Sequence, residues 1–142
     1  MNKTKIIIHC SATKPSMNIG ANEIREWHIA RGWSDIGYNG IIKRDGTFEA
    51  GRDLDGDGDF LEETGAHARG FNKESIGFCL VGGVDENGQP DSNFTFKQLK
   101  TLYEIVNDTM ANFGISEVCG HRDLPNVAKA CPCFNVEAFF SA

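Results

Sequence analysis

The stretch Lys5-Ile6-Ile7-Ile8-His9, near the start of the chain, predicts a buried β-strand. Its three isoleucines are β-branched and stand between polar residues. A short apolar run without alternation is typical of a strand that is covered on both faces. His9 comes at the end of this run, where a side chain can reach a cleft. Residues 75–81 form a second run of the same kind and predict another buried strand.

The clearest helix begins at Thr95. Gln98 follows three residues later, and this spacing predicts a capping box. Gly114 ends the helix. The apolar residues that recur at helical spacing between these two ends are Phe96, Leu99, Leu102, Tyr103, Val106, Met110 and Phe113.

The remaining predicted elements are, in chain order, a helix over residues 21–31, a hairpin of residues 38–43 and 47–50 around an Asp-Gly turn, a strand over residues 117–119 and a short last helix after Asn135. Ile24, Trp27 and Ala30 share the apolar face of the first helix, and His28 is expected at the surface or half-buried. Strands alternate with helices. We therefore expect one α/β domain over residues 1–142, with a mixed central β-sheet flanked by helices.

The composition of the chain restricts the classes of protein to which it can belong. The chain has 142 residues, 40% of them hydrophobic and 24% charged, which is a globular balance. Its net charge of -6 argues against a nucleic-acid partner, because phosphate binding needs a basic face. No apolar run approaches the ~20 residues of a membrane span. The first five residues are polar, so we expect no signal peptide and synthesis in the cytoplasm. The odd count of five cysteines predicts mostly reduced thiols.

His9, His121 and Cys131 are the candidates for a metal site, because each follows or ends a predicted element. Two imidazoles and a thiolate suit zinc, and three protein ligands leave a fourth position for water. However, a lone histidine at a strand end is more often structural, and cysteine often fills space in a core. The spacings match no local zinc signature. Composition and spacing therefore leave zinc as one possibility.

The chain contains six short sequence motifs: residues 9–13 (HCSAT), 37–39 (GYN), 65–68 (GAHA), 75–77 (SIG), 120–123 (GHRD) and 129–132 (KACP). Any one is weak, but in this order the chain resembles the type 2 N-acetylmuramoyl-L-alanine amidase family. That family includes the lysozyme of T-odd bacteriophages and the peptidoglycan recognition proteins. The resemblance covers about residues 5–140.

The resemblance implies three zinc ligands, namely His9, His121 and Cys131. It further implies that Tyr38 lies over the metal, that Lys129 stabilises charge on the substrate carbonyl, and that His67 lines the cleft without binding zinc. Amide hydrolysis builds a tetrahedral oxyanion, and a cation beside the metal would stabilise it. Without the resemblance, Tyr38 and Lys129 would be an ordinary strand tyrosine and a solvated lysine.

The function implied is cleavage of the amide bond between N-acetylmuramic acid and L-alanine in peptidoglycan, by a phage or prophage endolysin. We expect a monomer that reaches the cell wall after release from the cytoplasm, with peptidoglycan as partner and zinc as cofactor. A peptidoglycan-binding module without catalysis is the first alternative, but that class lacks the cysteine ligand. A phage lysozyme that also regulates an RNA polymerase is the second, less favoured because few residues precede the first strand.

Three departures from the family pattern carry predictions. Amidases that recycle wall fragments resemble this chain but have Glu at the place of Cys79 and Asp at the place of Cys131; the differences favour the phage-lysozyme branch. Gly40 stands where the family often has a bulky residue, and we expect it to open the pocket wall. The loop from His121 to Cys131 is slightly longer than usual, which bears on the position of Lys129.

Residues 53–64 suggest a calcium loop. Carboxylates recur at loop positions one, three, five and seven, at Asp53, Asp55, Asp57 and Asp59. A glycine occupies position six, as calcium loops require. Position twelve is Thr64 instead of the usual Glu, and Glu62 or Glu63 could bend in to substitute for it. The alternative is a solvated acidic loop, so Ca²⁺ remains open beside it.

Overall fold

The structure is a computed structural model and describes residues 3–141. Its helices and strands are β1 (Lys5–Cys10), α1 (Ala21–Ala30), β2 (Gly40–Ile42), β3 (Phe48–Ala50), β4 (Ser75–Leu80), α2 (Phe96–Phe113), β5 (Glu117–Gly120), the 3-10 helix η1 (His121–Asp123) and α3 (Val136–Ser141). Each predicted element is present, with ends that differ by at most two residues. Within residues 3–141, no helix combines the length and the apolar character that crossing a bilayer requires.

The sheet has the strand order β3-β2-β4-β1-β5. β2, β4, β1 and β5 run parallel, and β3 is antiparallel to β2. The prediction of a mixed central sheet is confirmed. β1 lies between β4 and β5, with Lys5 opposite both Ser75 and Glu117. The carboxyl ends of these three strands therefore meet at one edge of the sheet.

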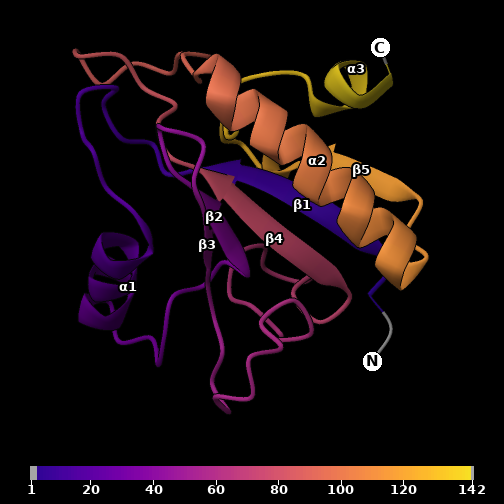
Figure 1. Ribbon diagram of the computed structural model, residues 1–142. Helices are drawn as coiled ribbons and strands as arrows, with labels where there is room; N and C mark the ends of the chain where they lie inside the picture. The colour runs from indigo at the N-terminus through magenta and orange to yellow at the C-terminus, as the bar shows by residue number, and fades with distance from the viewer. Residues whose placement is uncertain (1–2, 142) are drawn as a thin grey trace.

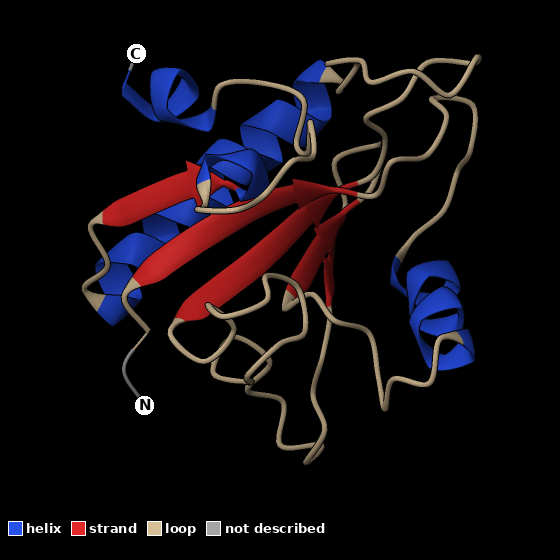
Figure 2. Cartoon of the chain, turned by 180° about the vertical axis from the view of Figure 1, so that it is seen from behind, coloured by secondary structure: helices blue, strands red, loops and turns tan. Residues whose placement is uncertain are grey.

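The two faces of the sheet are covered differently. Ile6 and Ile8 of β1 pack with Leu102 of α2 in the larger core, and α2 crosses that face (Figure 1). Ile7 points the other way and packs with Ala68. Loops run across this second face (Figure 2). His9 has the parity of Ile7, so its imidazole lies on the face that loops cover.

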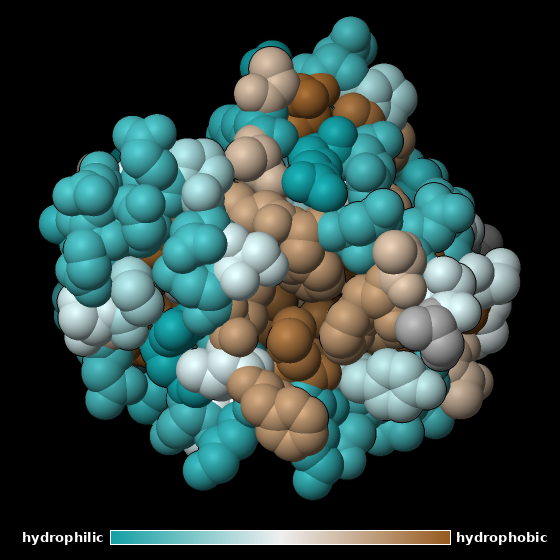
Figure 3. Space-filling model, turned by 90° about the horizontal axis from the view of Figure 1, so that it is seen from above, coloured by the Kyte–Doolittle hydropathy of each residue, from teal (hydrophilic) through white to brown (hydrophobic). Residues whose placement is uncertain are grey.

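α2 begins and ends as predicted. Gln98 N–H donates to the Thr95 hydroxyl at 3.1 Å, and Thr95 N–H donates to the side-chain oxygen Oε1 of Gln98 at 3.0 Å. Gly114 adopts a left-handed conformation with φ 66°. The apolar stripe is only partly buried, because Phe96 is 81% and Tyr103 50% exposed. Figure 3 shows apolar side chains gathered on this part of the surface.

Two predictions about the first helix are wrong. Trp27 is 38% exposed, whereas His28 is 7% exposed and belongs to the core side. The buried residues of α1 are Ala21, Ile24 and His28. His28 follows Ile24 by four residues and so shares its face.

The expectation for Gly40 is also wrong. A Cβ at Gly40 would lie 2.5 Å from the Phe48 ring and 2.9 Å from the Phe78 ring. These aromatic side chains fill the space that the missing side chain leaves. Phe78 belongs to the core beneath α2, so Gly40 tightens the packing of that core and opens no pocket.

Candidate functional site

His9, His121 and Cys131 come together at the carboxyl edge of the sheet. His9 is the next-to-last residue of β1, and His121 opens η1 directly after β5. One ligand atom of each residue lies within 4.8 Å of the other two. The ring centroids of His9 and His121 are 4.5 Å apart. Two imidazoles and one thiol at this separation form a donor set that suits zinc.

Cys131 is held beside the histidines by backbone contacts. Arg122 N–H donates to the Cys131 carbonyl at 2.8 Å, which folds the loop back on η1. Cys10 N–H donates to the Cys131 sulfur at 3.2 Å. The Cys131 sulfur also lies 3.9 Å from the Cys10 carbonyl oxygen, so both backbone contacts of the sulfur are to the end of β1.

His67 lies directly behind His9. The distance from His9 Nε2 to His67 Nδ1 is 2.8 Å, and the two rings meet edge to face. Burial, followed by the neighbouring histidines, lowers the pKa of His9 well below its usual range. Burial also lowers the pKa of His67, to about 3. Both imidazoles are therefore neutral at pH 7.

Tyr38 and Lys129 line the same cavity, which measures about 240 Å³. The Tyr38 ring centroid is 5.1 Å from that of His9. Burial raises the pKa of Tyr38 well above its usual range, so its hydroxyl keeps a proton to donate. Lys129 is exposed, and its charge adds to burial in lowering the pKa of His121. The longer loop thus still brings Lys129 to the metal-ligand candidates.

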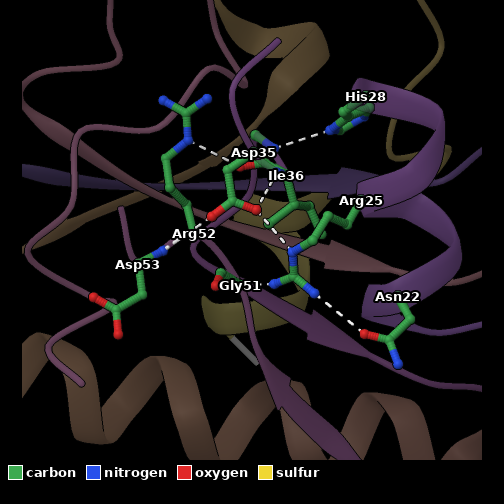
Figure 4. A network of polar contacts seen from close by, with 9 residues as sticks. Asn22, Arg25, His28, Asp35, Ile36, Gly51, Arg52 and Asp53 are labelled. Carbon is green, nitrogen blue, oxygen red and sulfur yellow. Dashed lines mark hydrogen bonds and ion pairs between the residues drawn. The ribbon is translucent and has the colours of Figure 1, made fainter. Parts of the chain in front are cut away.

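α1 and the turn that follows it supply a wall of the cavity that the sequence did not predict. His28 and Trp33 line the cavity with their ring centroids 4.5 Å apart. His28 Nδ1 accepts a hydrogen bond from Gly37 N–H at 2.9 Å, and Arg25 pairs with Asp35 at 2.7 Å (Figure 4). Burial lowers the pKa of His28 to about 4. The spacing of His28 four residues after the apolar Ile24 was the feature of the sequence that could have predicted its burial.

The acidic loop forms a second cluster of possible ligands. Asp53, Asp55 and Asp57 each offer an oxygen within 4.8 Å of one another, together with Glu63. Asp59, the fourth predicted ligand, is outside this group among the described residues. Over residues 3–141, Asp53 Oδ1 is the buried side-chain atom without a hydrogen-bond partner. Glu63 is one of the two residues that the sequence offered in place of the ligand missing at position twelve.

The comparisons with known proteins agree with this geometry. The family profile described as N-acetylmuramoyl-L-alanine amidase matches residues 1–134. The endolysin of Enterobacteria phage T3 is 47% identical over 135 residues, covering 95% of this chain and 83% of the phage protein. The endolysin of Escherichia phage T7 is 45% identical over the same shares of both proteins.

Among solved structures, the N-acetylmuramoyl-L-alanine amidase LysC from Clostridium intestinale is similar over 99% of this chain and 85% of its own. The TM-score is 0.80 and the sequence identity 27%. The sequence match and the structural match therefore cover nearly the same residues as the six motifs.

Proposed function

This chain belongs to the N-acetylmuramoyl-L-alanine amidase family, and on that premise we propose that it is a zinc-dependent endolysin that separates the stem peptide from the peptidoglycan glycan strand. The amidase activity follows from family membership and from the phage relatives. The proposal adds the metal, the residues and the biological setting. The observation that carries it is the convergence of His9, His121 and Cys131 within 4.8 Å.

The three residues fit zinc by their chemistry. His9 is buried and neutral and so keeps a lone pair for a metal. The Cys131 sulfur is held at the site by a hydrogen bond from Cys10 N–H. Zinc bound to such a set supplies Lewis acidity and a water of lowered pKa.

Tyr38 and Lys129 would act on the substrate. The amide carbonyl gains negative charge as it becomes tetrahedral, and fixed donors near that oxygen stabilise the charge. The protonated hydroxyl of Tyr38 and the ammonium group of Lys129 both face the cavity that holds the metal-ligand candidates. We assign Tyr38 and Lys129 to the oxyanion and the cavity that they share to the muramoyl–alanine junction.

A binding module without catalysis is not favoured, because the complete ligand set is present. We further propose that one domain over residues 1–142 performs the reaction as a monomer. The protein would be made in the cytoplasm and would act on the wall after release, as the phage relatives named endolysin suggest. Nothing in the described residues favours an RNA polymerase as a second partner.

Digestion of purified peptidoglycan tests this function. An amidase releases new L-alanine amino termini and no reducing sugar ends, whereas a glycosidase does the reverse. We expect about one zinc per chain by elemental analysis, lost in Cys131→Ser. Cys133→Ser is the matched control, because its sulfur contacts the Gly83 carbonyl at 3.2 Å and is outside the ligand group. A metal-free protein that still cleaves peptidoglycan would overturn the proposal.

Calcium binding by the acidic loop stays a prediction. The donor set that the geometry favours is Asp53, Asp55, Asp57 and Glu63. Carboxylates this close repel one another unless protons or a cation intervene. The buried Asp53 oxygen without a partner among the described residues is the kind of atom that a hard cation would satisfy.

A further inference from the structure

Two buried side chains, those of His67 and Ser75, continue from His9 into the protein as a chain of hydrogen bonds. His9 Nε2 is 2.8 Å from His67 Nδ1, and His67 Nε2 is 3.2 Å from the Ser75 hydroxyl. The Ser75 hydroxyl is in turn 2.7 Å from the Phe71 carbonyl oxygen. The chain therefore ends on an atom that can only accept.

That end point fixes every proton along the chain. A serine hydroxyl has one proton, and Ser75 donates it in the hydrogen bond to the Phe71 carbonyl. Ser75 Oγ must then accept from His67, so His67 carries its proton on Nε2. A neutral imidazole has only one N–H, which leaves His67 Nδ1 as an acceptor, and His9 must donate to it from Nε2.

Placing either histidine proton on Nδ1 would bring two atoms without a shared proton face to face. If His67 carried its proton on Nδ1, its bare Nε2 would face Ser75 Oγ, whose proton is already engaged. If His9 carried its proton on Nδ1, two unprotonated nitrogens would face each other at 2.8 Å. Burial keeps water from relieving either conflict, because His9 is 1% and Ser75 0% exposed.

The backbone holds the His67 ring in this position. Ser75 and Gly77 point to the same side of β4, and a Cβ at Gly77 would lie 2.5 Å from Cγ and Nδ1 of His67. The imidazole therefore occupies the space above Gly77. The Asn72 side-chain oxygen accepts from the backbone N–H groups of His67 and Ala68, at 2.8 Å each.

We propose that His67 is a positioning residue, which fixes the proton of His9 on Nε2 and so presents Nδ1 of His9 to the metal. This role rests on the proposed zinc site. It also gives a purpose to the motif Ser75-Ile76-Gly77, in which Ser75 sets the proton on His67 and Gly77 makes room for its ring. Partners of this kind orient metal-binding histidines, and their loss commonly costs about 10- to 100-fold in metal affinity.

The first test determines which ring nitrogen of His9 and of His67 carries the proton. Nitrogen-15 spectra of the zinc-loaded protein, assigned with His67→Asn, should show His9 and His67 each protonated on Nε2. The Ser75→Ala variant should lose this single form of His67, because the acceptor that selects it is gone. A proton on Nδ1 of His9 in a protein that binds zinc would overturn the inference and leave the proposed function intact.

The second test uses a matched pair of variants at one position. His67→Asn keeps an oxygen that can accept from His9, and His67→Leu has nearly the same size without it. In competition with a chelator, we expect zinc affinity to fall about 10- to 100-fold in His67→Leu and clearly less in His67→Asn. Equal losses in the two variants would overturn the inference. If His67→Leu does not fold, Ser75→Ala against wild type supplies the affinity comparison, and unchanged affinity with unchanged spectra would count against the inference. A wild-type protein that binds no zinc would overturn the proposed function and this role together.

Discussion

Gly77→Ala is the substitution that best distinguishes an effect on the proposed zinc site from an effect on the rest of the fold. The new Cβ would lie 2.5 Å from two atoms of the His67 ring and 2.7 Å from a third. Ordinary van der Waals contact begins at 3.4 Å, so the ring has to move by about 1 Å. A shift of that size in a buried slot is enough to break the 2.8 Å hydrogen bond to His9.

Two quantities should respond. Overpacking of this kind costs about 1–3 kcal/mol of folding free energy. Zinc affinity should fall by about 10- to 100-fold, because His9 loses the partner that orients it. Denaturant unfolding measures the first quantity, and competition with a chelator measures the second, both on the purified protein.

Ile76→Val is the matched control on the same strand. Ile76 points into the core beneath α2, on the opposite face from His67. Loss of its methyl group costs about 0.5–1.5 kcal/mol, with zinc affinity unchanged. If Gly77→Ala were destabilised while retaining wild-type zinc affinity, then the space above Gly77 that the His67 ring occupies would have no part in presenting His9 to the metal.

Three further predictions concern the reaction, the substrate and the acidic loop. Lys129→Ala and Tyr38→Phe should each lower turnover by about 10²–10³ while zinc stays bound; full activity in Lys129→Ala would exclude the lysine from the oxyanion site. Because Cys79 replaces the Glu of recycling amidases, polymeric wall should be cleaved in preference to soluble anhydro-muropeptides, as product release from both substrates would show. Calorimetric titration of chelator-treated protein should detect Ca²⁺ binding that Asp53→Asn abolishes and Asp59→Asn retains; the absence of heat and of any rise in melting temperature at millimolar Ca²⁺ would leave an ordinary acidic loop.

The sequence predicted those features that depend on neighbours in the chain. The isoleucines before His9 predict a strand without knowledge of its partners, and the capping box of Thr95 and Gln98 is complete within four residues. The Asp-Gly turn forms a hairpin for the same reason. The assignment of His9, His121 and Cys131 as zinc ligands depended on the family resemblance, because their positions alone left zinc as one possibility.

Features that depend on register were not predictable in this way. His9 and His67 are 58 residues apart and meet only because β1 and β4 pair in one particular alignment. The burial of His28 depends on which face α1 turns to the cavity. Gly40 shows the same limit, since only the structure reveals that Phe48 and Phe78 fill its place.

The central position of β1 also governs when the protein can become active. Cys10 and Cys131 are 121 residues apart and yet in hydrogen-bond contact, so the first strand and the segment after β5 must meet before the proposed zinc site can form. A growing chain on the ribosome already carries His9 but has neither His121 nor Cys131 to join it. Closing loops of this length is slow compared with forming local helices. With the proposed ligand set, activity would therefore appear only after the whole domain has been synthesised, and a cut that removes the segment after β5 should abolish cleavage of the wall.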